Sequence, residues 1–283
     1  MKAKVLVLVT LAMLAVMPAL AQSVVDDATR EGLRGVPDTW GFSLGSFWQT
    51  FNSKVRLDGK NQSGDWVNLE RDFGLNRTLT DFNFEAFYRF SPHHRLELSY
   101  TTWNRSYSKS LSREIHWGDA IYEAGATLTA SNKANLANVI YRYSFFNNGK
   151  VEFGVNAGIS ALWMETKLSG EGTITGGGTL AGTIAESKSV IAPIPVVGAA
   201  FEMTLTSRWF WRAQGNFFAA NVAGFNGNLQ EWQTSTDYFV TKNVGLGAGF
   251  ASTFYHVTKS SKAGDFALRY GFSGVTAYAK FVF

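Results

Sequence analysis

The chain has 283 residues, no cysteine, and 26 basic against 22 acidic side chains, which gives a formal net charge of +4 at pH 7. The lack of cysteine excludes a disulfide framework, thiol catalysis and cysteine metal sites. Part of the small positive charge lies in an N-terminal segment that we expect to be removed. It therefore gives no reason to predict a nucleic-acid partner.

The N-terminus has the pattern of a secretory signal peptide. Lys2 and Lys4 precede an apolar stretch over 5–16, and Ala19-Leu20-Ala21 forms a small-residue cleavage motif. The apolar stretch is shorter than the roughly 20 residues that a membrane-spanning helix needs. We expect residues 1–21 to be a signal peptide cleaved after Ala21, 22–39 to be a short periplasmic segment, and 40–283 to form one barrel domain.

The rest of the chain alternates apolar and polar residues in segments that predict β-strands. No later segment approaches the length of a membrane helix, and a membrane chain without such helices must close a barrel, because lipid offers open strand edges no hydrogen-bond partners. We predict an all-β fold, a transmembrane antiparallel up-and-down barrel of ten strands, with eight as the alternative if the hairpin at 229–257 is misread. The expected strands are 41–57, 79–90, 95–107, 134–145, 151–165, 190–203, 208–221, 229–240, 243–257 and 266–283.

Connections between these strands alternate in length, as in outer-membrane barrels, whose short turns face the periplasm. The exception is the brief segment 222–228 on the side of the long connections. The short connections are 91–94, 147–149, 206–207 and 241–242, and the long ones are about 58–78, 107–133, 166–189 and 258–265.

The alternation also predicts which face meets lipid. Within 79–90, Phe82 and Phe84 share one face, whereas Asn83 and Glu85 share the other. A membrane barrel turns its apolar face outward and its polar face inward. Aromatic residues near both ends of the strands fit the girdles expected at the two membrane interfaces.

Charged residues beside three of the short turns share the polar phase. We interpret them as a lumenal layer of opposite charges that satisfy one another in a narrow barrel, with a gate or conduction filter as the alternative. The expected pairs across the turns are Arg89 with Glu97, Arg142 with Glu152, and Glu202 with Arg212.

The C-terminal strand ends on alternating apolar residues, with Phe281 and Phe283 in the same phase. Upstream, Tyr270 and Phe272 carry the apolar residues in the opposite phase, which predicts a bulge near Gly274.

These features resemble the broad family of small proteobacterial outer-membrane β-barrels. The resemblance rests on Tyr88-Arg89-Phe90-Ser91 and its echo at 141–144, on the stretch 112–119, and on the terminal Phe283. It implies an outer-membrane location and recognition of Phe281 and Phe283 as an assembly signal by the barrel-assembly machinery. Similarity to the outer membrane protein W group is weaker, because that group is eight-stranded; it is linked to small hydrophobic solutes.

Function is less specified than fold. We expect a non-enzymatic barrel without cofactor, either structural or forming a narrow channel for small solutes, with outer-membrane lipid and lipopolysaccharide as its partners. One alternative is adhesion or ligand binding through the long loops, notably the glycine-rich 170–184. Another is an enzyme that modifies lipid A or cleaves protein, for which His256 is the candidate residue. No His/Asp/Glu cluster has the spacing of a metal site.

Overall fold

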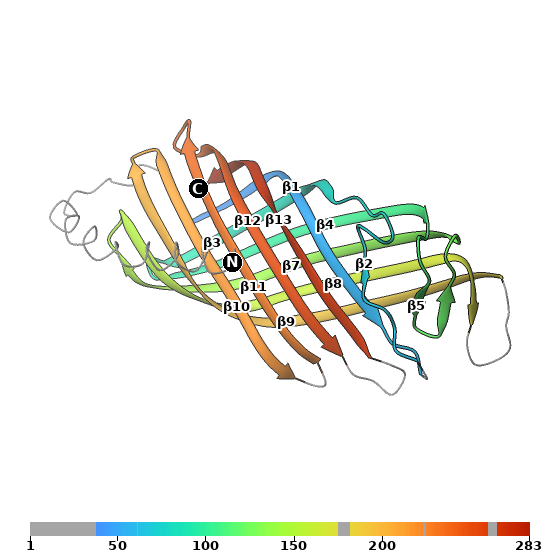
Figure 1. Cartoon of the computed structure of the whole chain (residues 1–283). Coiled ribbons are helices and arrows are strands. Elements are labelled where there is room, and N and C mark those ends of the chain that lie inside the picture. Colours follow the sequence, from blue (N-terminus) through green and yellow to red (C-terminus); the bar gives the residue numbers. More distant parts are fainter. Residues whose placement is uncertain (1–37, 61, 175–181, 223–224, 260–264) are drawn as a thin grey trace, which may run out of the picture.

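The computed structural model describes residues 38–60, 62–174, 182–222, 225–259 and 265–283. The expected signal peptide and the segment 22–37 lie outside these residues. No helix among the described residues is long and apolar enough to cross a membrane. Ten long strands build the molecule (Figure 1): β1 (Trp40–Leu57), β3 (Thr78–Ser91), β4 (His94–Ser110), β7 (Thr127–Asn147), β8 (Val151–Ile174), β9 (Gly182–Thr206), β10 (Trp209–Val222), β11 (Phe225–Phe239), β12 (Val244–Lys259) and β13 (Phe266–Val282).

The strands form a closed antiparallel barrel. Each long strand pairs with the long strands before and after it, and β1 pairs with β13 to complete the ring. The seam runs without interruption from Gly41 opposite Val282 to Leu57 opposite Phe266. The predicted fold class and the count of ten strands are confirmed, and the eight-stranded alternative is wrong, because the hairpin at 229–257 is present as β11 and β12.

The strands differ greatly in length. β8 has 24 residues and β9 has 25, whereas β10 has 14. At roughly 3.3 Å per residue, β8 is about 80 Å long, far more than a strand needs to cross a membrane. The expected long connections 107–133 and 166–189 are thus largely strand, and β7, β8 and β9 rise past the other strands (Figure 1). β9 pairs with β10 only from Val197 to Thr206 and continues outward beside β8 alone.

The outer end of the barrel is capped by its own connections. The short strands β2 (Val67–Asn68), β5 (Ile115–Trp117) and β6 (Ala120–Tyr122) lie there. β2 pairs with β1, and β6 pairs with β5 and with the end of β8. Val67, Leu69, Phe73 and Trp117 are buried in one apolar cluster with the barrel interior. The cap therefore adds a packed core beyond the membrane.

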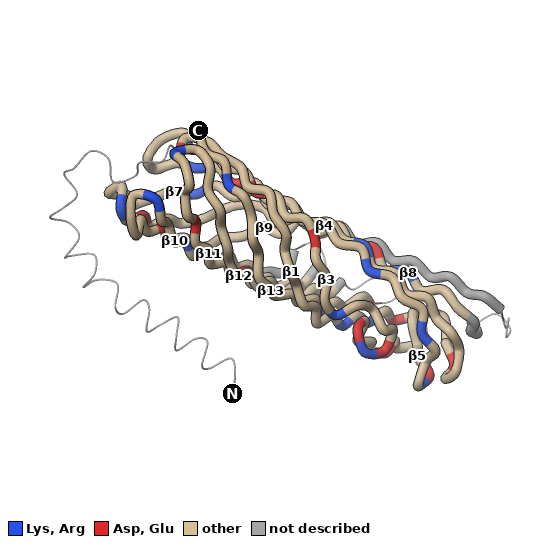
Figure 2. The backbone as a smooth tube through the Cα atoms, turned by 90° about the horizontal axis from the view of Figure 1, so that it is seen from above, with Lys and Arg blue, Asp and Glu red and all other residues tan. Residues whose placement is uncertain are grey.

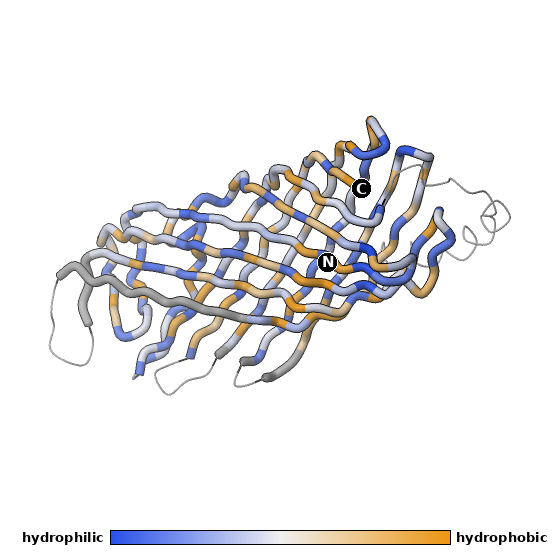
Figure 3. The backbone as a smooth tube through the Cα atoms, turned by 180° about the vertical axis from the view of Figure 1, so that it is seen from behind, coloured by the Kyte–Doolittle hydropathy of each residue, from blue (hydrophilic) through white to orange (hydrophobic). Residues whose placement is uncertain are grey.

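Hydrophobic and hydrophilic residues follow one another along the strands (Figure 3). Many of the hydrophobic residues are exposed and form an apolar band on the outer surface of the barrel. On β12, Val244, Leu246, Phe250 and Phe254 are all exposed. These ten residue steps cover about 33 Å along the strand, or about 25 Å when the strand is tilted by 40°. That height matches the apolar band of an outer-membrane barrel. The exposed aromatic residues near the short turns are Trp40, Tyr88, Phe90, Tyr143, Phe145, Trp209 and Tyr238.

The predicted bulge near Gly274 is absent. The registers of β13 with β1 and with β12 both pass through Gly274 without a shift. Tyr270 and Phe272 are instead buried inside the barrel. The apolar phase changes because the lumen itself becomes apolar toward the outer end, so the strand has no need to switch faces.

Gly274 is required by the close approach of β1. A Cβ atom at this position would lie 1.9 Å from the carbonyl oxygen of Trp48, whereas at Gly227 the nearest atom would be at 3.5 Å. We expect Gly274→Ala to lower the free energy of unfolding by about 1–3 kcal/mol through overpacking. Gly227→Ala, the control, should stay within about 0.5 kcal/mol of the wild type. Urea titration of the refolded protein followed by tryptophan fluorescence measures both, and equal midpoints for the two variants would contradict this account.

Candidate functional site in the barrel lumen

The lumen contains three layers. Nearest the short turns lies a layer of buried or half-buried arginines and acidic residues, called here the charge layer: Arg89, Arg95, Glu97, Arg142, Glu152, Glu202 and Arg212. Above it is a polar cavity, and above the cavity lies a group of rings called here the aromatic plug: Phe47, Phe51, Trp103, Tyr270 and Phe272. Each layer is built by inward-facing positions of the alternating strands.

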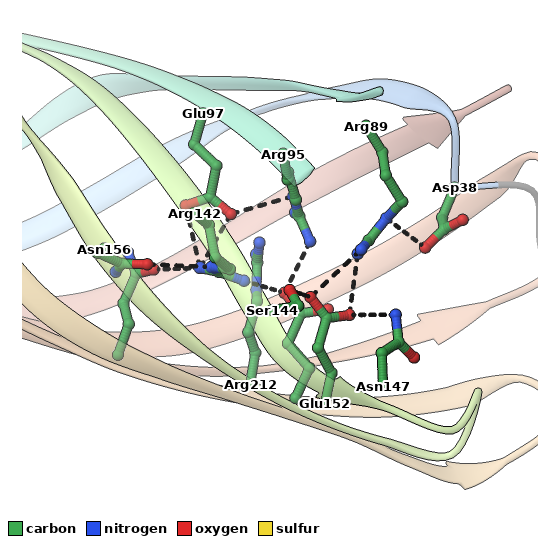
Figure 4. Close-up of polar contacts among 12 residues, drawn as sticks. Asp38, Arg89, Arg95, Glu97, Arg142, Ser144, Asn147, Glu152, Asn156 and Arg212 are labelled. Atoms are coloured by element: carbon green, nitrogen blue, oxygen red, sulfur yellow. Dashed lines mark hydrogen bonds and ion pairs between the residues drawn. The ribbon is translucent and has the colours of Figure 1, made fainter. Parts of the chain in front are cut away.

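Arg142 on β7 is the centre of the charge layer (Figure 4). Its guanidinium lies 2.7 Å from Glu202 and 2.9 Å from Glu97. It also donates hydrogen bonds to Asn156 and Gln214 at 3.2 and 2.7 Å. Only 1% of Arg142 is exposed. A buried guanidinium is tolerated only when its N–H groups and its charge are compensated in this way.

Two of the other three arginines of the layer also contact carboxylates. Arg89 lies 3.0 Å from both Glu152 and Asp38, and Figure 4 shows it between these two carboxylates. Arg95 lies 2.8 Å from Glu202 and 3.1 Å from Glu97. Each of these two carboxylates therefore bridges Arg95 and Arg142.

The structure places all six predicted charged residues in the lumen, but the expected partners are wrong. Arg89 opposes Arg95 across the first turn and reaches Glu152 from a different hairpin. Arg142 opposes Asn156 and forms ion pairs with Glu97 and Glu202. Glu202 does oppose Arg212, yet Arg212 contacts Glu85, at 3.7 Å. In a lumen this narrow a long side chain can reach strands other than its hairpin partner, as Arg89 does toward Glu152 on β8.

The polar cavity lies between the charge layer and the aromatic plug and has a volume of about 120 Å³. Its walls carry carboxylates, amides and hydroxyls, including Glu85, Glu231, Asn138 and Thr276. A smaller cavity of about 50 Å³ at the short-turn end shares Phe87, Arg95, Arg212 and Lys280 with it. The guanidinium of Arg95 stacks over the ring of Phe87 at 4.2 Å. These side chains lie between the two cavities.

The aromatic plug closes the lumen above the cavity. Trp103 stacks on Tyr270 at 5.9 Å between ring centroids and contacts Phe272 at 5.2 Å. Its indole N–H donates a hydrogen bond of 2.6 Å to the Tyr270 hydroxyl. The rings belong to one continuous buried cluster with Leu162, Met164, Ile194, Val196, Leu229 and Tyr255 from the other strands. Apolar side chains therefore fill this level of the lumen from wall to wall.

A loop carboxylate fixes the plug from above. Glu70, in the connection between β2 and β3, lies 2.7 Å from Arg105 and accepts the backbone N–H of Ser53 at 2.9 Å. Arg105 also donates to Tyr270 and stacks over Phe51 at 4.0 Å. The ion pair thus joins the inward-folded connection to two rings of the plug.

The histidines do not meet in the lumen. His256 lies on the outer face of β12, because its neighbours Tyr255 and Val257 are the buried, inward-facing residues. His116 lies in β5, 2.7 Å from Glu114 at the outer end. His93 and His94 lie at the first short turn, next to Tyr143. No three described His, Asp or Glu residues lie close enough together to hold a metal ion.

The terminal phenylalanines lie at the seam. Phe283 stacks on Trp40 at 4.4 Å and Phe281 stacks on Phe42 at 5.0 Å. Trp40 and Phe283 also exchange backbone hydrogen bonds of 3.0 and 2.8 Å. The residues expected to direct assembly are thus the ones that join the last strand to the first.

Several lumenal ion-paired residues lie outside the three expected charge pairs. They are Arg95, Arg105, Glu70 and Asp237. Arg95 and Arg105 lie on the same face of β4 as Glu97, so alternation along that strand is enough to predict that both point into the lumen. Glu70 lies in a connection and has no such signal.

Arg142 tests whether the charge layer stabilises the fold. Arg142→Met leaves Glu97 and Glu202 with one arginine fewer in a buried site, and we expect it to lower the free energy of unfolding by about 3–5 kcal/mol. Adding Glu97→Gln and Glu202→Gln should recover part of that loss. Arg71→Met, which removes an exposed arginine, is the matched control and should remain close to the wild type. Urea titration reports all variants, and an unchanged midpoint for Arg142→Met would show that the layer adds no stability.

No protein-family model and no curated protein matches the sequence. Solved structures do match the fold. The outer membrane protease OmpT from Escherichia coli is 10% identical and aligns over 87% of this chain and 97% of its own, with a TM-score of 0.55. OprG from Pseudomonas aeruginosa aligns over 88% and 99%, with 10% identity and a TM-score of 0.34. The toluene transporter TodX from Pseudomonas putida aligns over 87% and 89%, with 9% identity and a TM-score of 0.35. The chain is therefore a closed ten-stranded barrel with the fold of small bacterial outer-membrane proteins.

Proposed function

We propose that this chain is a non-enzymatic outer-membrane barrel with a structural role and that its lumen does not conduct in the state described here. The observation that carries the proposal is the aromatic plug, which fills the lumen beyond the cavity. Two proposals accompany it. The barrel-assembly machinery recognises Phe281 and Phe283, and outer-membrane lipid, including lipopolysaccharide, surrounds the apolar band.

A conducting channel needs a continuous hydrated path between the two ends of the barrel. Here the path ends at Phe47 and Phe272, which line the upper wall of the cavity. The cavity of about 120 Å³ is polar enough to hold water, but water held there reaches no farther than these rings. Opening a path would require at least Trp103 and Tyr270 to leave a packed cluster, which costs several kcal/mol.

The inward-folded connection strengthens this closure. Arg105 is buried and only 9% of the Glu70 side chain is exposed, so separating them would leave each charge without its ion-pair partner. The penalty for an unpaired buried charge is large compared with thermal energy. Thermal motion alone is therefore not expected to release the loop and open the outer end.

Planar-bilayer recording tests the closed lumen. We expect the wild-type protein to show no discrete conductance, and the Trp103→Ala/Tyr270→Ala variant to show discrete steps because the plug has lost its two largest rings. Arg71→Met, which removes a side chain outside the lumen, is the control and should stay silent. Discrete wild-type steps that change in Arg142→Ala would overturn the closed barrel and establish the channel.

A second candidate function is surface binding through the outer extension. The observation that favours it is the β8–β9 hairpin, whose backbone pairing continues to Gly172 opposite Gly182. The tip of the glycine-rich stretch, 175–181, lies outside the described residues. A rigid barrel that raises a long hairpin above the membrane is suited to present a binding loop.

Deletion of 170–184 tests this candidate. The deleted residues lie beyond the apolar band, so we expect the barrel to fold and to keep its heat-modifiable migration in SDS gels. If the hairpin is a binding element, surface adhesion of cells that display the protein should fall to the level of cells without it. Unchanged adhesion would remove the hairpin from consideration.

A further inference from the structure

The apolar band has a sharply placed outer boundary on the face formed by β12, β13 and β1. Phe254 is the last exposed large apolar residue of β12. It lies opposite Gly271 of β13, which in turn lies opposite Asn52 of β1. Because the band below it has the height of the hydrocarbon layer, Phe254 marks the level where hydrocarbon ends and lipid headgroups begin.

The next row outward is basic. His256 lies opposite Arg269, and Arg269 lies opposite Lys54. All three occupy outward positions, because the residues on either side of each along its strand are buried. This row is two residues above Phe254, about 7 Å along the strand and about 5 Å in height at a tilt of 40°. Arg56 lies two residues beyond Lys54 on β1 and is the next outward-facing basic residue of that strand.

Trp66 orients the arginines of this face. The guanidinium of Arg269 lies 4.7 Å from the centroid of the indole, and that of Arg56 lies 5.6 Å from it. A guanidinium that stacks on a ring keeps its N–H edge available for an anion. Arg56 also lies 3.3 Å from Asp58, so Arg269 and Lys54 are the more available cations.

Acidic side chains do not balance this row. On the described outward positions of β11, β12, β13 and β1 there is no Asp or Glu, because Glu231 and Asp237 of β11 belong to the lumenal phase. Within the described residues, neither Lys54 nor Arg269 has an ion pair. A basic row without acidic neighbours at headgroup level attracts phosphate.

We propose that Lys54 and Arg269, with Arg56 and Trp66 beside them, bind the phosphate groups of a phosphorylated glycolipid of the outer leaflet. This proposal rests on the outer-membrane location and deepens the lipid partnership proposed above. The glycolipid would place its acyl chains along Phe254 and Phe250 and its phosphates against the N–H groups of Arg269 and Lys54. The site is on the outer surface and is independent of the lumen.

The test measures binding of bis-phosphorylated lipid A to the folded protein in nanodiscs of zwitterionic lipid. The comparison ligand is lipid A whose phosphates have been removed enzymatically. We expect the wild type to bind the phosphorylated form about tenfold more tightly, as two exposed ion pairs would give. Lys54→Gln/Arg269→Gln should lose this preference, and Lys54→Arg/Arg269→Lys should keep it.

The control variant is Lys133→Gln/Lys242→Gln, which removes the same number of charges from a distant strand and from a short turn. It should stay within about twofold of the wild type, since a screened charge acts over only about 10 Å. Equal wild-type affinity for the two lipids, or unchanged affinity in Lys54→Gln/Arg269→Gln, would overturn the proposal. Heat-modifiable migration checks folding of each variant, and bilayer recording reports the closed lumen separately, so failure of one proposal is distinguishable from failure of the other.

Discussion

Closure of the sheet between β1 and β13 is the constraint on which the rest of the structure depends. A strand edge in lipid would leave its N–H and C=O groups without partners, so the first and last strands must pair over their full length, as they do. Ten strands closed in this way enclose a lumen that side chains can nearly fill. The terminal Phe283 and Phe281 contribute directly, because they stack on the first two aromatic residues of β1.

The narrow lumen then determines how its polar groups are arranged. A charged residue placed there cannot reach bulk water, so it needs a partner from whichever strand lies across the barrel. Arg142 and Arg95 share the two carboxylates of Glu97 and Glu202 for this reason. Where the inward positions become apolar, the same geometry produces a plug of rings in contact. In Figure 2, most of the charged residues lie toward the two ends of the molecule.

Strand number, strand order and the lipid-facing phase followed from the sequence because alternation is a local property with a fixed period of two. The partners of Arg89 and Arg142 did not follow, since they depend on which side chains meet across the lumen. The change of phase near Gly274 would require a bulge only if the lumen were polar at every level. At the level of Tyr270 and Phe272 the lumen is filled with apolar rings, so the apolar residues face inward without a bulge. Glu70 could not be foreseen, because a connection has no periodicity from which its direction can be read.

The unequal lengths of β9 and β10 have a consequence for solubility. Beyond Val197 the described part of β9 pairs with β8 only, so its other side is a free β-edge. Such an edge is a template onto which another chain can add a strand. Pro193 and Pro195 lie on this stretch, two residues apart, and therefore direct their nitrogen atoms to the same side. Proline has no N–H to donate, so two of the five prolines of the chain protect this unpaired edge of β9 against pairing and aggregation.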